Sequence, residues 1–178
     1  YEVTAIADIA AYADVSVPTV FNYFGTKDGI LLELITAEHD QWRARVKAMR
    51  EEESGDPATR IGAFLVATSD NSLRHADRAT WRHVEAACIR QPTSDFVKRY
   101  KVLADSMGDA FAGLLEDLVA RGKAPATMAS PAIAAMLFNH WGVRFVALVT
   151  DDAMTFEVHA AQLCDDAAAL VALALSPP

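Results

Sequence analysis

The sequence predicts an all-α protein with a small N-terminal helix-turn-helix head and a larger C-terminal helical bundle that dimerises. Alanine dominates a composition with only 8 glycines and 7 prolines, and alanine is the strongest helix former. Capping residues and helix breakers recur along the chain, whereas the alternating pattern of β-strands is nearly absent. With 52% hydrophobic residues, the 178-residue chain can bury a real core. We expect residues 1–35 to form the head and residues 36–178 to form the bundle.

Helix boundaries follow from residues that cap N-termini and from the glycines and prolines that end helices. The predicted helices span about 5–13, 17–24, 27–53, 57–75, 78–90, 95–121, 131–149 and 156–175. Their expected N-caps are Thr4, Ser16, Thr26, Asp56, Asp77, Thr93 or Ser94, Ser130 and Thr155. Only "EEESGDP" and "GKAPATMASP" are typical of flexible joints.

Residues 4–24 are predicted to form a helix, a tight turn and a second helix. Asp14 occupies the turn, where a left-handed backbone is often required and Asp is well tolerated. Apolar residues of both helices are spaced to close on one small core. These residues are Ile6, Ile9, Ala10, Ala13, Val15, Val20 and Phe24.

The outer face of the second helix carries short or hydrogen-bonding groups near its N-terminus. They are Val17, Pro18, Thr19, Asn22 and Tyr23. Such groups suit a helix that enters the major groove of DNA, where Asn pairs with adenine and Thr contacts thymine. An ordinary helical hairpin with a polar outer face explains the pattern equally well.

The stretch "YEVTAIADIAAYADVSVPTVFNYFGTKDGILLELI" favours the DNA-binding alternative, because it resembles the second to fourth helices of TetR-family transcriptional regulators. The resemblance rests on "DIA", on the "A-x-VS" turn, on "PTVFNYF" and on the Thr-Lys-acidic start of the next helix. The family's first helix and its often basic arm would lie before Tyr1. The rest of the chain resembles the family only in the number and length of its helices.

The resemblance implies roles for single residues of the head. Ser16 would cap the reading helix, Val17, Pro18, Thr19 and Asn22 would face bases, and Tyr23, Lys27 and Thr4 would meet the DNA backbone. Ala5 and Phe21 replace hydroxyl-bearing residues that are frequent in the family. Residues 1–35 are also acidic, since Lys27 opposes Glu2, Asp8, Asp14, Asp28 and Glu33, a net of 1 − 5 = −4. Phosphate contacts dominate DNA affinity, so we expect cations upstream of Tyr1 to compensate.

The last two helices are predicted to form the dimer interface. The helix from Pro131 is apolar on two faces, one of them Met136, His140, Val143 and Ala147, and such a helix must be covered on both sides. Pairing with a second copy would build a four-helix bundle, as the resemblance also implies. The expected interface residues are Phe138, Phe145, Phe156, Ala160, Leu163, Ala167 and Leu170. A two-fold dimer matches a palindromic operator in double-stranded DNA.

The resemblance further implies a cavity for a small-molecule effector among the middle helices. Candidate lining residues are Trp81, His83, Phe111, Asn139, His140, Trp141 and Arg144. Each alone is more often a structural residue. Arg144 would suit an anionic ligand, or else an interfacial carboxylate such as Asp151 or Asp152. Gly108 and Gly113 indicate either close helix packing or room for a ligand.

Bulk properties narrow the functional classes. A net charge of −8 disfavours a protein coated with nucleic acid. Cys88 and Cys164 are expected to be buried free thiols of a cytoplasmic protein. No apolar run is long enough to predict a membrane span. The basic strip of Arg43, Lys47 and Arg50 indicates a solvated face, or an accessory phosphate contact.

These observations favour a homodimeric DNA-binding regulator, expected to be a repressor that a small molecule releases or modulates. The alternative is a helical interaction protein that keeps the head fold without useful DNA affinity, which the acidic head favours. No catalytic spacing, metal cluster or phosphate loop is visible, so we expect neither enzyme activity nor a cofactor or metal.

Overall fold

The computed structural model describes residues 1, 3–52 and 55–175. Over these residues the chain forms eight α-helices and one short 3₁₀ helix, without a strand, which confirms the predicted all-α class. The helices are α1 (Ile6–Tyr12), α2 (Val17–Phe24), α3 (Lys27–Glu51), α4 (Pro57–His75), α5 (Arg78–Arg90), α6 (Asp95–Ala120), η1 (Ala126–Ala129), α7 (Pro131–Thr150) and α8 (Phe156–Leu175).

Most predicted N-caps are confirmed by hydrogen bonds from backbone N–H groups to the capping side chain. The residues that accept these bonds are Ser16, Thr26, Asp56, Asp77, Ser94, Ser130 and Thr155. The prediction for Thr4 is wrong: α1 begins after Ala5, whose N–H donates to Asp8 Oδ2 at 2.9 Å. The Asp8 carboxylate therefore accepts from a backbone N–H at the start of α1, where the Thr4 hydroxyl was expected to act as the cap.

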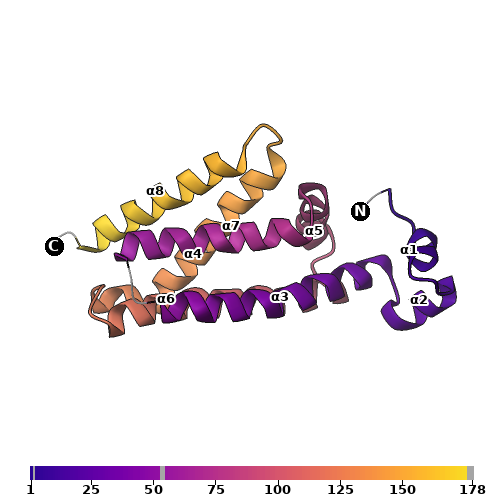
Figure 1. The fold of residues 1–178 in the computed structure, drawn as a ribbon, viewed down its shortest axis with the longest axis horizontal. Coiled ribbons are helices and arrows are strands. Elements are labelled where there is room, and N and C mark those ends of the chain that lie inside the picture. Colours follow the sequence, from indigo (N-terminus) through magenta and orange to yellow (C-terminus); the bar gives the residue numbers. More distant parts are fainter. Residues whose placement is uncertain (2, 53–54, 176–178) are drawn as a thin grey trace.

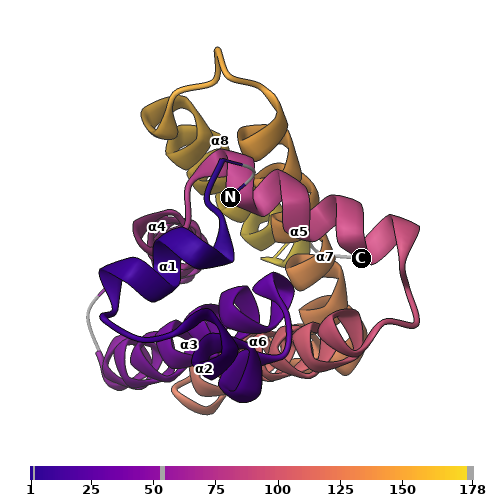
Figure 2. The same cartoon turned by 90° about the vertical axis from the view of Figure 1, so that its right-hand side faces the viewer.

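The molecule is elongated, with the head at one end and the bundle at the other (Figure 1). The long helix α3 starts in the head and runs beside α6 along the bundle, while α4 packs between α3 and α8. Viewed from the head end, α1 and α2 lie in front of the bundle (Figure 2). Helix α3 is continuous across residue 35, where we place the domain boundary.

An aromatic cluster occupies the centre of the bundle. Phe111 is fully buried and packs edge-on against Phe64, with ring centroids 5.0 Å apart. Trp141 stacks on Phe145 at 5.3 Å, and Phe145 meets Trp81 edge-on at 5.4 Å. Such rings bury large apolar areas and gain about 0.5–1.5 kcal/mol per favourable pair. They join helices α4, α5, α6 and α7 into one core.

The prediction of a dimer interface is wrong for three residues. Phe145, Leu163 and Ala167 are 3%, 0% and 0% exposed within a single chain. Phe145 of α7 packs in the aromatic core. The α8 stripe with Leu163 and Ala167 packs against α4, at a distance that Gly62 permits, since a Cβ on that glycine would lie 3.2 Å from the Cα of Cys164. Four others are half-buried against the core: Phe138, Phe156, Ala160 and Leu170.

Two local predictions also need correction. Met128 is fully buried in η1, so "GKAPATMASP" is an ordered connection and not only a joint. In the other expected joint, residues 53–54 lie outside the described residues. Cys164 is exposed and Cys88 half-buried, although both are free thiols as expected. Cys164 lies where α8 passes close to Gly62 of α4, at the surface and not in the core.

The core of the head is smaller than predicted. Ala10 and Val20 are buried, whereas Val15 and Phe24 remain 43% and 40% exposed. The turn at Asp14 has the expected left-handed backbone, with φ of 53°. Helices of 7 and 8 residues provide little surface, so α1, α2 and the start of α3 leave these two side chains partly uncovered.

Helices α7 and α8 are long and apolar enough to cross a membrane by length and composition alone, which the short apolar runs did not predict. This is weak evidence, because the core helices of bundles pass the same test. Both helices contain charged residues, and Arg144 of α7 forms an ion pair with Asp166 of α8.

Candidate DNA-reading head and ligand cavity

The reading helix α2 is shaped by its first residues. Pro18 lies in the first turn, where its missing N–H costs nothing. Ser16 Oγ accepts the Thr19 N–H at 3.2 Å and lies 2.8 Å from Thr19 Oγ1. The cap thus fixes both the start of the helix and the direction of the Thr19 hydroxyl.

The polar face of α2 points away from the rest of the chain. Pro18 and Asn22 are exposed, Tyr23 is 81% exposed, and Val17 and Thr19 are half-buried. Helix α2 itself lies at the end of the molecule away from the bundle (Figure 1). Groove reading by this face, and the individual base and phosphate contacts, stay predictions.

Lys27, a predicted phosphate contact, faces Tyr1 in this structure. Its Nζ donates to the Tyr1 carbonyl oxygen and lies 4.0 Å from the centre of the Tyr1 ring. His83 of α5 also stacks on that ring, with centroids 4.0 Å apart, and its Nε2 lies 3.2 Å from Asp28 Oδ1. Thr4 is exposed beside this junction between head and bundle. A phosphate must compete with Tyr1 for the Lys27 ammonium group.

A partly open cavity of about 50 Å³ lies between α3, α4, α5, α6 and α7. We call it the inner cavity. Its lining is mainly aromatic and aliphatic: Leu34, Ile35, Glu38, His39, Trp42, Asn71, Ser72, His75, Ala76, Trp81, Tyr100, Leu103, Ala104, Met107 and Trp141. A convergent apolar pocket with a few polar groups is the usual form of a ligand site.

Of the seven predicted pocket residues, Trp81 and Trp141 line the inner cavity and the other five do not. Phe111 is sequestered in the aromatic core, and His83 is at the head junction. Asn139 is exposed on α7. Arg144 and the exposed His140 both contact the Asp166 carboxylate of α8, Arg144 with two hydrogen bonds at 2.7 and 2.9 Å. Arg144 therefore pairs neither with Asp151 nor with Asp152.

The polar residues of the inner cavity were not predicted. Glu38 lies one turn before Trp42 on the side of α3 that faces the core, and an acidic residue at that spacing was the available signal. His39 Nε2 lies 3.0 Å from Ser106 Oγ. Burial, with a contribution from Arg43, lowers the pKa of His39, which favours the neutral ring.

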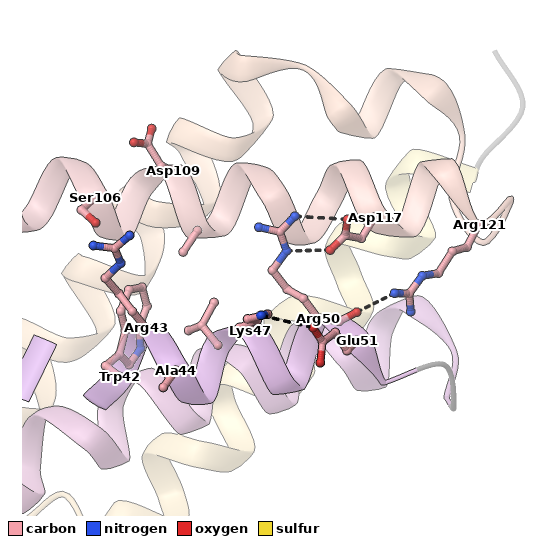
Figure 3. A pocket seen from close by; sticks show the side chains of 12 residues that line it. Trp42, Arg43, Ala44, Lys47, Arg50, Glu51, Ser106, Asp109, Asp117 and Arg121 are labelled. Carbon is pink, nitrogen blue, oxygen red and sulfur yellow. Dashed lines mark hydrogen bonds and ion pairs between the residues drawn. The ribbon is translucent and has the colours of Figure 1, made fainter. Parts of the chain in front are cut away.

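A second, open cleft of about 770 Å³ runs between α3 and α6 (Figure 3). We call it the outer cleft. The predicted basic strip lines it: Arg43 and Lys47 reach into it, and Arg50 crosses it to Asp117. Arg50 donates two hydrogen bonds to the Asp117 carboxylate, at 2.6 and 3.1 Å. A Cβ on Gly113 would lie 2.3 Å from Arg50 Nη1, so Gly113 serves this close approach.

Among the residues that the structure describes, no group of three or more His, Cys, Asp or Glu side chains is placed to hold a metal ion. The buried Ser69 hydroxyl lies 2.9 Å from His159 Nε2 and accepts from Trp141 Nε1, also at 2.9 Å. This network lies deep in the core, where it ties α4, α7 and α8 together.

Comparisons with known proteins agree with the geometry of the head and with the fold. Residues 1–34 match the sequence model of the family described as "Bacterial regulatory proteins, tetR family". The fold is similar to the crystal structure of a transcriptional regulator of the TetR/AcrR family from Thermobifida fusca YX-ER1. The TM-score is 0.60 at 19% identity, over 99% of this chain and 90% of the other. No curated protein matches the chain. Residues 1–34 thus match the N-terminal segment of the TetR family, and the chain has a fold similar to that of a TetR/AcrR-family regulator.

Proposed function

We propose that this protein is a homodimeric, sequence-specific repressor whose DNA affinity is controlled by a small molecule in the inner cavity. The observation that most supports this is the exposed polar face of α2 at the tip of the molecule, with Ser16 orienting Thr19. That face belongs to the segment that matches the TetR family. Transcription regulation through DNA follows from the family, whereas repression and ligand control are our inference.

The proposed reading residues are Thr19 and Asn22, with Val17 and Pro18 in apolar contact with bases. Asn22 suits a bidentate pair with adenine, and the Thr19 methyl group suits thymine. Tyr23 and Lys27 would bind phosphate oxygens, together with backbone groups near Thr4. Because the head has few cations, the salt dependence of binding should be shallow for this chain.

The proposed dimer surface is the outer face of α7 and α8, revised from the buried stripe of α8. Met136 and Val143 on α7 are 70% and 69% exposed, and Leu173 on α8 is 75% exposed. A groove between the two helices separates Met136 from Leu173. Exposed apolar groups in such number are typical of a partner surface. Two copies paired here would bury them in a four-helix bundle.

The proposed ligand control follows from the size and position of the inner cavity. At about 50 Å³ it is far smaller than a typical ligand site of roughly 300–1,000 Å³. A ligand therefore has to move the surrounding helices, one of which is α3. Since α3 continues into the head, the two arrangements of the bundle would hold the heads differently, and a ligand that prefers one of them would shift DNA affinity.

The decisive experiment measures binding to duplexes selected from a random library and to the DNA upstream of the native gene. Thr19→Ala combined with Asn22→Ala should abolish sequence-specific binding and leave the helical content unchanged. The matched control is Gln41→Ala combined with Thr127→Ala, two exposed polar residues outside the head. Equal specific binding by both double variants would reject the assignment of α2 as the reading helix.

A second candidate function is a helical interaction protein without useful DNA affinity. The engagement of Lys27 by Tyr1 and the acidic head favour this alternative. It predicts that the folded dimer selects no sequence from the library, even at low salt. Specific binding that weakens with added salt would exclude it.

A further inference from the structure

We infer that the inner cavity selects small organic cations over neutral or anionic molecules of the same shape. This inference rests on the proposed function, because it names the chemical class of ligand for the cavity proposed there. Its three supports are the charge of the lining, the state of the Glu38 carboxylate, and the aromatic walls.

Glu38 is the one residue with a formal charge at neutral pH in the lining of the inner cavity, with the histidines taken as neutral, and no Lys or Arg belongs to that lining. The chain places its cations elsewhere: Arg43, Lys47, Arg50 and Arg121 line the outer cleft. Trp42 lines both spaces. A ligand in the inner cavity therefore meets the Glu38 carboxylate without a Lys or Arg among the described residues of the lining, and His75 is the one lining side chain among them that forms an ion pair with this carboxylate when protonated.

The Glu38 carboxylate lacks a well-aligned partner. Its Oε2 atom is buried and accepts no hydrogen bond among the described residues. His75 Nε2 lies 2.8 Å from Oε2 but without the alignment of a hydrogen bond. The Glu38 side chain is 17% exposed, and a buried carboxylate oxygen without an aligned hydrogen bond is costly, a cost that a cationic ligand would relieve. An anionic ligand would add to it.

Aromatic walls complete the site. Trp42, Trp81 and Trp141 all line the cavity, together with Tyr100. The faces of such rings attract cations, and the attraction grows when water is excluded. Burial raises the pKa of Tyr100, so the phenol stays neutral and adds no charge. Alkylated ammonium groups suit this combination of one carboxylate and several rings, because their methyl groups also gain from apolar contact.

Three isosteric probes test the inference on the full chain. Choline, 3,3-dimethylbutan-1-ol and 3,3-dimethylbutanoate share one shape and carry a positive, no and a negative charge. The readout is tryptophan fluorescence, because all 3 tryptophans of the chain line this cavity; Trp81 and Trp141 do not line the outer cleft, whereas Trp42 does, so a Trp42→Phe variant confines the signal to the inner cavity. We expect choline to bind at least about tenfold more tightly than the alcohol, a difference of about 1.4 kcal/mol, and the carboxylate to bind most weakly.

Glu38→Gln keeps the size of the side chain and should remove the preference for choline while leaving the affinity for the alcohol unchanged. The matched control is Asp109→Asn, a carboxylate on α6 that lines the outer cleft instead and should change neither affinity. Equal binding of choline and the alcohol, a preference that survives Glu38→Gln, or binding of no probe at all would each overturn the inference. DNA selection by the same protein, measured separately, shows whether the proposed regulator function fails as well.

Discussion

The contact between Gly113 and Arg50 leads to a prediction whose sign depends on a neighbouring side chain. Replacing a glycine by alanine inside an exposed helix stabilises it by about 1 kcal/mol. Here the new Cβ would lie 2.3 Å from Arg50 Nη1 and 2.5 Å from its Cζ. Because this group is the far end of a flexible side chain, the guanidinium swings away and the backbone stays in place. The cost is the loss of both hydrogen bonds to Asp117.

The size of that cost follows from the exposure of the ion pair. The side chains of Arg50 and Asp117 are 34% and 28% exposed, so the pair is worth more than a surface salt bridge of about 0–1 kcal/mol and less than a buried one. A value of about 1–2 kcal/mol cancels or slightly exceeds the gain in helix propensity. We therefore expect Gly113→Ala to change the free energy of unfolding by between 0 and about −1 kcal/mol in the wild type.

The same substitution should behave differently once Arg50 is truncated. In an Arg50→Ala background the three atoms nearest to the new methyl group are removed, so Gly113→Ala should stabilise by about 1 kcal/mol. Urea unfolding of the four proteins at one protein concentration gives the coupling free energy. An equal stabilisation in both backgrounds would show that the close approach of Arg50 to Gly113 does not determine the effect.

Three further predictions concern the outer face of α7, the Asp117 carboxylate and the buried Ser69 hydroxyl. Val143→Glu should raise the dimer Kd by at least about 100-fold, because an unpaired carboxylate would be buried between copies; sedimentation measures this, and an unchanged Kd would exclude the α7 face. Hydrogen bonding from Arg50 lowers the pKa of Asp117. The stability lost in Asp117→Asn should therefore be largest above about pH 4 and shrink as the pH falls toward the lower folded-state pKa. Urea unfolding between pH 2 and 7 measures this, and a difference that stays constant with pH would contradict it. Ser69→Ala should destabilise by about 1–3 kcal/mol for each buried group that loses its partner, Trp141 Nε1 and the His159 ring; a loss below about 0.5 kcal/mol by the same assay would show that water replaces the hydroxyl.

Local features of the sequence predicted the helices well, because caps and turns depend on residues close together in the chain. Ser16 caps α2 through a residue three positions away, and Asp14 takes its left-handed conformation within its own turn. Thr4 is the instructive failure. Helix α1 could begin with either Thr4 or Ala5 as its N-cap, and the bond from the Ala5 N–H to the Asp8 carboxylate favours Ala5.

The residues that pack on distant helices were harder to predict. The stripe on α8 with Leu163 and Ala167 shows that this face is buried, but periodicity does not say by what. The partner is α4, roughly 100 residues earlier, where Gly62 permits the close approach. The ion pair between Arg144 of α7 and Asp166 of α8 was likewise not predicted, because periodicity does not say which helix lies beside α7. Trp81 and Trp141 line the inner cavity, and their role in ligand binding stays a prediction. The spacing of Glu38 one turn before Trp42 was a signal in the sequence, but only the packing of α3 against α6 shows that the two residues line one cavity.

The position of the Arg50 contact also determines how α3 is expected to respond to a ligand. Arg50 fastens the far end of α3 to α6 through Asp117, and Trp42 of the inner cavity lies 8 residues from it, or about 12 Å along the helix. Lys27, where α3 begins in the head, lies 23 residues from the same anchor, or about 35 Å. If α3 pivots as a rigid rod about the Arg50 contact, a displacement at the cavity grows about threefold at the head. An opening of about 1 Å around a ligand would then move the head by about 3 Å, close to the rise of a single base pair. The Arg50–Asp117 contact is needed for this larger displacement at the head. Without it, α3 could move as a whole, and the head would move only as far as the helix does at the cavity.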